Sequence, residues 1–321
     1  MRLVLAPIAE FSDAPFRQMC FAGGADSACT EMVSAAALRH GHLPSAAMLE
    51  KAPGEGRLVC QIFGSDELDL ALAAREISNT GGRFAAIDLN AGCPMPRIVR
   101  NGDGAALVKS PEKVMRLLVA IKENTHLPVT LKTRLGPRIG ETTVFEIADA
   151  AASAGAVEMT VHARYVSQMH GGPADLATLA ELVSRSKIEI TGNGGVTDLD
   201  SLRAMLSTGV ESVMIARAAM KNPFIFARLK AAAAGLPEPQ TPGPPELFAM
   251  HRDFVLAFHK IIASKYPGFA SSAEDCVVQK FKTQFFRYFS GTPGAAAMRG
   301  ALAGLKTAAE AEALVLGMRT D

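Results

Sequence analysis

The chain has 321 residues, of which 49% are hydrophobic and 20% charged, as in an ordinary globular protein with one large domain or two unequal ones. The formal net charge of +1 excludes a strong overall attraction to nucleic acid, so any site for a polyanion must be a local patch. Five cysteines without metal-ligand spacing argue against a disulfide framework or a metal site and favour a reducing cytoplasm. No apolar stretch has the length of a signal segment or a membrane span, so we expect no membrane contact.

Short apolar segments alternate with helical ones up to about Arg228. We expect strands at residues 3–8, 27–32, 58–63, 86–90, 129–134, 158–163, 188–191 and 212–216. Helical periodicity, capping residues such as Ser110 and terminating glycines predict helices at residues 66–80, 111–124, 143–154, 176–186 and 199–207. Strands alternating with helices in this way predict a closed parallel (β/α)8 TIM barrel of the α/β class. An open doubly wound sheet is the alternative.

The composition changes after Arg228. Residues 231–246 run from alanines into a proline-rich linker, which we interpret as a domain boundary. Helical patterns at residues 246–265, 273–289, 294–305 and 308–316 then predict a small bundle. We therefore expect a catalytic barrel over residues 1–235 and a helical domain over residues 236–321. The bundle carries Lys280, Lys282, Arg287 and Tyr288 close together, a basic patch with an aromatic, although such patches are usually solvated helix faces.

Polar residues and glycines follow one predicted strand after another. In a parallel barrel the carboxyl ends of the strands form the working face, so these residues meet at one rim. They are Pro7 and Ala9, Glu31, Gln61, Asn90 and Cys93, Lys132 and Arg134, His162 and Arg164, Asn193 with Gly194 and Gly195, and Ala216 with Arg217. Packing does not account for such a ring, which predicts a binding site.

Residues 87–111 hold the most informative stretch. An apolar strand ends in Asn90 and Cys93, which presents an amide and a thiol at its end. Arg97, Arg100 and Lys109 follow among glycines, a composition suited to a mobile cationic loop that closes over an anion. A buried structural cysteine is the alternative for Cys93.

Residues at four of the predicted strand ends point to a phosphorylated planar cofactor. The glycines of residues 191–196 allow close approach of the backbone to an anion, and Arg217 adds a cation one strand later. Lys132 in the mouth could stabilise negative charge on a reduced flavin ring. Gln61 could both donate to and accept from the edge of a heterocycle.

Several segments together match the successive motifs of one family. They are A-P-I-A-E-F-S-D-A-P-F-R at 6–17, Q-I-F-G-S at 61–65, D-L-N-A-G-C-P at 88–94, P-V-T-L-K-T-R-L-G at 128–136, V-H-A-R at 161–164, G-G-P-A-D at 171–175, G-N-G-G-V at 192–196 and M-I-A-R-A at 214–218. In this order they resemble the motifs of the tRNA-dihydrouridine synthases, and residues 280–291 resemble the C-terminal tRNA-binding region of that family. The chain departs from the family at Glu10-Phe11, Ala163 and Ala216, near or at positions where glycine is common.

The resemblance implies an FMN-dependent reductase that uses NADPH to saturate the 5,6 double bond of a uracil in tRNA. The implied flavin contacts are Pro7, Ile8, Ala9, Gln61, Lys132, His162, Asn193, Gly194, Gly195, Ala216 and Arg217. Hydride would pass from the flavin to uracil C6, and Cys93 would give a proton to C5, because a free thiol keeps its proton at neutral pH. The implied substrate contacts are Asn90, Arg134, Arg164 and, in the helical domain, Lys280, Lys282 and Arg287.

Two other functions remain open from the sequence. One is a flavin barrel that reduces a free pyrimidine, of the dihydroorotate dehydrogenase type; the linker and the locally basic helical tail favour tRNA instead. The other is a tRNA-binding factor without catalysis, which the complete set of Asn90, Cys93, Lys132 and His162 argues against. Nothing in the sequence indicates an obligatory protein partner, so we expect a cytoplasmic monomer that acts on tRNA.

Overall fold

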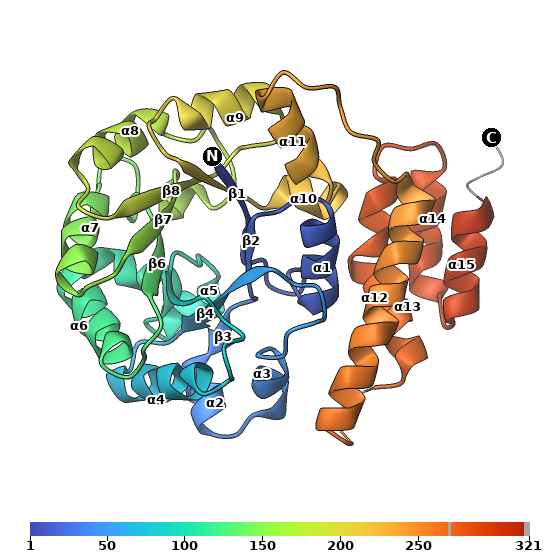
Figure 1. Ribbon diagram of the computed structural model, residues 1–321, viewed down its shortest axis with the longest axis horizontal. Coiled ribbons are helices and arrows are strands. Elements are labelled where there is room, and N and C mark those ends of the chain that lie inside the picture. Colours follow the sequence, from blue (N-terminus) through green and yellow to red (C-terminus); the bar gives the residue numbers. More distant parts are fainter. Residues whose placement is uncertain (269–270, 318–321) are drawn as a thin grey trace.

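The computed structural model describes residues 1–268 and 271–317, which form a barrel with a group of helices beside it (Figure 1). Its strands are β1 (Arg2–Leu5), β2 (Ser27–Cys29), β3 (Val33–Ser34), β4 (Arg57–Phe63), β5 (Ala86–Ala91), β6 (Val129–Arg134), β7 (Glu158–His162), β8 (Glu189–Asn193) and β9 (Ser212–Ile215). Parallel pairing runs from β1 through β2 and β4 to β9, which pairs back with β1. These eight strands close the ring, which confirms the predicted (β/α)8 barrel and excludes the open sheet. β3 pairs with the last residues of β4, beyond the part that β2 covers.

Helices surround the barrel and continue into the C-terminal part. They are α1 (Ala14–Ala22), α2 (Ala35–Arg39), α3 (Leu43–Ala47), α4 (Glu67–Ser78), α5 (Pro96–Arg100), α6 (Pro111–Lys122), α7 (Val144–Ser153), α8 (Leu176–Arg185), α9 (Leu199–Leu206), α10 (Arg217–Lys221), α11 (Ile225–Ala233), α12 (Pro244–Lys265), α13 (Ala273–Thr283), α14 (Ala295–Ala301) and α15 (Ala308–Gly317). Short 3-10 helices lie at Gly104–Lys109, Val166–Gln168, Phe285–Phe289 and Leu302–Gly304. The five predicted barrel helices are confirmed to within two residues at either end by α4, α6, α7, α8 and α9.

Strand alternation explains how polar groups reach the barrel mouth. In β6, Val129 and Leu131 are buried in the hydrophobic core, while Lys132 and Arg134 alternate with them and line the central cavity. Helix starts follow capping chemistry, since Asp66, Asp175 and Asp198 each accept a backbone N–H of the first turn. Ser110, the predicted cap of α6, makes no such side-chain bond.

Three predicted segments differ in the structure. The first predicted strand ends at Leu5, three residues early, and residues 6–8 line the mouth instead. The loop predicted to be mobile contains α5 and then a 3-10 helix whose Leu107 and Val108 are in the core, so its second half is packed against the barrel. The helix predicted for residues 273–289 stops at Thr283, because the Gln284 side chain turns to the carbonyls of residues 10 and 11 and a 3-10 turn follows.

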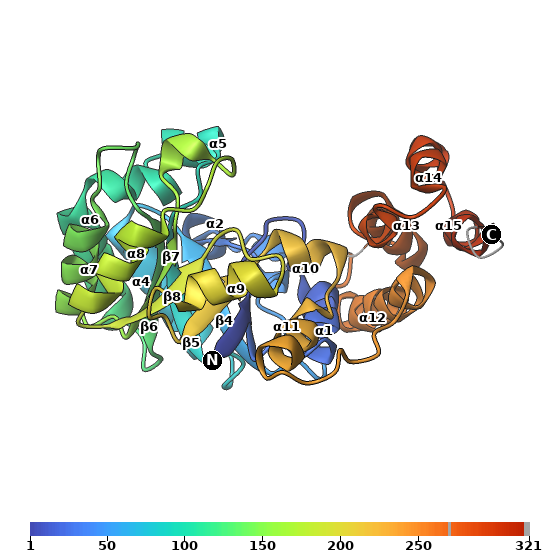
Figure 2. The ribbon, with the colours of Figure 1, turned by 90° about the horizontal axis from the view of Figure 1, so that it is seen from above.

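The C-terminal helices have a hydrophobic cluster of their own. Phe248, Phe281 and Phe285 pack edge to face, with ring centroids 5.4 to 6.2 Å apart. Met19 of α1 belongs to this cluster rather than to that of the barrel, and α12 packs against α1. Figure 2 shows the C-terminal helices on the α1 and α11 side of the barrel, joined to it through the segment between α11 and α12. Within the described residues, no helix combines the length and apolar character needed to cross a bilayer.

Candidate active site

A cavity of about 970 Å³ opens at the carboxyl ends of the barrel strands. All the residues predicted to contact flavin line it: Pro7, Ile8, Ala9, Gln61, Lys132, His162, Asn193, Gly194, Gly195, Ala216 and Arg217. Asn90, Cys93 and Arg134 line it as well. The fold therefore brings these residues, which come from seven strand ends, to one cavity, as the barrel topology requires.

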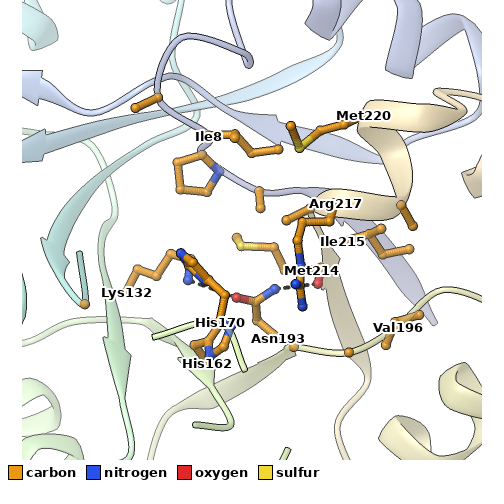
Figure 3. A pocket seen from close by; sticks show the side chains of 18 of the residues that line it. Ile8, Lys132, His162, His170, Asn193, Val196, Met214, Ile215, Arg217 and Met220 are labelled. Carbon is orange, nitrogen blue, oxygen red and sulfur yellow. Dashed lines mark hydrogen bonds between the residues drawn. The ribbon is translucent and has the colours of Figure 1, made fainter. Parts of the chain in front are cut away.

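Lys132 is held at the centre of this cavity by an amide. Its ammonium donates to Oδ1 of Asn193 over 3.1 Å, and Nδ2 of Asn193 donates to the carbonyl of Met214 over 2.7 Å, as the dashed lines in Figure 3 show. Burial, together with the neighbouring Arg134, lowers the pKa of Lys132 to about 8. The structure thus keeps a lysine whose positive charge is costly, and an anion bound beside it would relieve that cost.

His162 lies next to this lysine and is uncharged at neutral pH. Burial and the cations Lys132 and Arg134 lower its pKa to about 2. Its Nδ1 is buried, and no hydrogen-bond partner for it exists among the described residues. His170, which sequence reasoning missed, stands 6.2 Å away between ring centroids and also lines the cavity (Figure 3). The sequence feature that could have identified it is its position after β7, directly before the glycine pair at residues 171–172.

The loop after β8 lines the cavity with two glycines. Gly194 and Gly195 have φ of 120° and 86°, which favour glycine. A Cβ on Gly194 would come within 3.1 Å of Nη1 of Arg164, another buried atom without a partner in the described part of the chain. Ala216 has φ of −119°, outside the left-handed region that favours glycine.

Cys93 is half-buried at the edge of the cavity, in a turn that Asn90 holds. Oδ1 of Asn90 accepts the backbone N–H groups of Gly92 and Cys93 over 3.1 and 3.0 Å. Gly104 of the following 3-10 helix packs so closely that a Cβ there would lie 2.9 Å from the Cys93 carbonyl oxygen. Cys93 therefore sits in a fixed turn and is half-buried on the cavity wall, outside the hydrophobic clusters of the described residues, which disfavours the alternative of a buried packing cysteine.

The two arginines predicted to orient substrate are largely engaged by the backbone. Arg134 donates from Nε to the Gly92 carbonyl over 2.8 Å and from Nη1 to the Met169 carbonyl over 2.7 Å. Arg164 donates from Nε and Nη2 to the Gly172 carbonyl over 3.0 and 2.9 Å, and it does not line the cavity directly. Both side chains hold the loops around the mouth.

The basic residues predicted in the C-terminal helices do not form one exposed patch. Lys280 pairs with Asp13 of the barrel over 2.5 Å, and Arg287 lies over the Phe11 ring at 5.1 Å. Tyr288 is buried, and its hydroxyl shares a hydrogen bond of 2.8 Å with Nδ1 of His251, so the prediction of an aromatic in a surface patch is wrong. Lys282 is half-buried. The amphipathic pattern could not reveal that this face of the helices meets the barrel.

A closed parallel barrel whose strand ends surround a cation-rich cavity is the architecture of a (β/α)8-barrel enzyme. Solved structures agree on the fold. Histamine dehydrogenase from Rhizobium sp. 4-9 is 15% identical with a TM-score of 0.53, covering 79% of this chain and 49% of that one. Morphinone reductase in complex with tetrahydroNAD is 13% identical with a TM-score of 0.52, and the match covers 74% of this chain and 88% of that one.

Sequence comparison identifies the family. A family model described as Dihydrouridine synthase matches residues 4–319. A probable tRNA-dihydrouridine synthase of Treponema pallidum is 36% identical over 69% of this chain and 68% of its own length, and one of Rhodobacter capsulatus is 32% identical over 82% and 80%. tRNA-dihydrouridine synthase B of Serratia marcescens is 34% identical over 71% and 68%. The chain belongs to the dihydrouridine synthase family and is an oxidoreductase, as its motifs predicted.

Proposed function

We propose that this protein holds FMN in the barrel mouth and, with NADPH as reductant, reduces the 5,6 double bond of uridines in tRNA. The family match and the named relatives support this activity. The observation that carries it is the placement of the Cys93 thiol on the same cavity as Lys132 and His162. A tRNA substrate implies a cytoplasmic site of action, and the C-terminal helices after residue 235 would form the tRNA-recognition domain.

The residues of the cavity fit a phosphorylated flavin. Among the described residues, two buried atoms have no hydrogen-bond partner: Nδ1 of His162 and Nη1 of Arg164. The His162 ring and the Arg164 guanidinium border Gly194 in the loop after β8, where a phosphate could approach the backbone. Arg217 adds a cation there, and Gln61 with Lys132 would face the ring system. Bound FMN would supply the hydride; the protein supplies position, charge and the proton.

The proposed proton donor is Cys93. Asn90 holds the backbone of the turn that carries Cys93, so the residue from which the thiol extends is fixed beside the cavity. Lys132 would stabilise negative charge that develops on a uracil or flavin oxygen, since a cation in a buried site acts more strongly than in water. Asn90 lines the same cavity, and the second N–H of its Nδ2 would be the group that meets a base edge, because Oδ1 already accepts two backbone N–H groups.

A uridine in folded tRNA must leave its stack to reach this cavity. We expect phosphates of the entering RNA to contact the exposed Arg97 and Arg100 of α5 and the cavity residues Lys221 and Arg228. We therefore expect affinity for tRNA to fall with salt despite the small net charge.

The direct test is the absorption spectrum of the purified protein, followed anaerobically by NADPH and then by unmodified tRNA. We expect a yellow protein that bleaches with NADPH and is reoxidised by tRNA, with dihydrouridine found in the digested RNA. Uridine and orotate serve as matched acceptors, because a free-pyrimidine reductase would be reoxidised by them. A colourless protein that takes up no FMN yet binds tRNA would contradict the proposal and favour the binding factor.

A further inference from the structure

A chain of buried side-chain hydrogen bonds runs beneath the cavity and ends at Cys93. Asp88 of β5 accepts from the Thr130 hydroxyl over 2.7 Å and from Nε2 of Gln61 over 2.8 Å. Oε1 of Gln61 accepts from Nδ2 of Asn90 over 2.8 Å. Oδ1 of Asn90 then accepts the backbone N–H groups of the turn that carries Cys93. Three adjacent strands, β4, β5 and β6, contribute to this chain.

Asp88 sets the donor-to-acceptor direction of this series of hydrogen bonds. Burial raises the pKa of Asp88 to about 6, even with hydrogen bonds from Gln61 and Thr130 that lower it, so the group is mainly a carboxylate at pH 7. A carboxylate only accepts, so Gln61 must turn its NH₂ group toward Asp88 and its carbonyl toward Asn90. Asn90 must then turn its own carbonyl toward the turn. The opposite orientation of Asn90 would set an NH₂ group against two backbone N–H donors.

We propose that Asp88 is a positioning residue that fixes the amide orientations of Gln61 and Asn90 and, through them, the turn that carries Cys93. The inference about the turn stands on these bonds, and its catalytic consequence rests on the proposed role of Cys93. Asp88 itself is 4% exposed and does not line the cavity, so it acts through the two amides rather than on a ligand. Losing the acceptor would leave buried donors without partners and free the amides to rotate.

The experiment compares Asp88→Leu with Thr130→Val. Both remove a buried hydrogen bond to the same carboxylate position, but only Asp88→Leu interrupts the bond to Gln61. In the full-length protein as purified, we expect amide hydrogen exchange at Gly92 and Cys93 to accelerate at least about tenfold in Asp88→Leu. Thr130→Val should leave both amides within about twofold of wild type, and Leu89 in β5 serves as the reference for general loosening.

A second readout concerns the reaction. In Asp88→Leu, the single-turnover rate of tRNA reduction should fall at least about tenfold relative to the rate at which NADPH reduces the bound flavin in the same variant. If Asp88→Leu fails to fold, Gln61→Met breaks the chain one bond later and must accelerate exchange at the same two amides. Unchanged exchange in the interrupting variant, or equal acceleration in Thr130→Val, overturns the proposal. If wild-type protein never reduces tRNA, the proposed function fails, whereas the exchange measurement still decides the role of Asp88.

Discussion

The barrel mouth and the contact between the barrel and the C-terminal helices use similar residues in opposite ways. At the mouth, Lys132 and Arg217 lie on the cavity, and within the described residues neither has a carboxylate at ion-pair distance. At the interface, Lys280 pairs with Asp13, and Lys265 of α12 pairs with Glu50 of the barrel. Cations left unpaired in a cavity mark a site for an anionic ligand, whereas paired cations hold two parts of the chain together.

The pKa shifts show the same difference between the mouth and the interface. Burial lowers the pKa values of Lys132 and His162, with neighbouring cations adding to it. Burial also lowers the pKa of Lys280, but Asp13 outweighs it and the net pKa is raised; for Asp13 the ion pair outweighs burial and lowers the pKa. The mouth is therefore electrostatically incomplete without a ligand, whereas at the interface Lys280 and Asp13 stabilise each other's charges.

The largest expected effect is at the mouth, in Cys93→Ala. If Cys93 is the proton donor, the rate of dihydrouridine formation in a single turnover should fall by about 10² to 10⁴, the usual contribution of general acid catalysis. The bound flavin and its reduction by NADPH should be unchanged. Cys276→Ala in α13 is the matched control, because that thiol lies in the C-terminal helices away from the cavity. Wild-type turnover in Cys93→Ala would remove Cys93 from the chemistry.

A second prediction concerns the positive charge of Lys132 at the mouth and its effect on FMN affinity. Lys132, with its pKa lowered to about 8, loses its charge as the pH rises through that value, and a bound anion would raise its pKa again. FMN binding should therefore take up a proton near pH 8, and affinity should weaken up to about tenfold per pH unit above it. Flavin fluorescence titrations between about pH 7.5 and 9.5 measure this slope.

Lys132→Met is expected to bind FMN more weakly at neutral pH, and its affinity for FMN should no longer change with pH between about pH 7.5 and 9.5. Lys109→Met, a substitution of an exposed lysine that does not line the cavity, should keep the pH dependence of the affinity. A wild-type affinity that does not change with pH in this range would mean that Lys132 does not face the bound anion.

At the interface we expect an effect on stability instead. Lys280→Met leaves Asp13 without its ion-pair partner in a site where the two side chains are 25% and 16% exposed, so unfolding should become easier by about 2 kcal/mol. A double-mutant cycle with Asp13→Asn in urea measures the coupling. The pair stabilises the fold above the ordinary pKa of an aspartate, and this contribution is lost as the pH falls through the lowered value.

The same variant decides between the structure and the sequence prediction for Lys280. If Lys280 only joins the two parts, Lys280→Met should leave the salt dependence of tRNA binding unchanged. A stable variant whose salt slope for tRNA falls by about one would instead identify Lys280 as a phosphate contact.

The barrel and its mouth could be predicted because local patterns decide them. Apolar periodicity marks the strands, and parallel topology then brings residues as distant in sequence as Pro7 and Arg217 to one rim. Which side chains pair with one another in the folded protein could not be predicted. Nothing near Lys280 in the sequence shows that it faces Asp13, and nothing near Asp88 shows that Gln61 donates to it, because both contacts depend on tertiary packing.

The smallest expected effect concerns the backbone conformation of Glu10, which lies between the interface and the residues of the mouth. Glu10 has φ of 65°, a left-handed conformation at the edge of the loop that carries residues 7–9, and Gln284 donates to its carbonyl over 2.9 Å. Glu10→Gly and Glu10→Ala both remove the exposed side chain, but only glycine adopts this conformation without strain. Glu10→Gly should therefore be more stable than Glu10→Ala by about 1 kcal/mol in urea, with flavin content unchanged in both. Equal stabilities would mean that residue 10 leaves the left-handed conformation in solution, so that the strain of a side chain there is not part of how the loop is held.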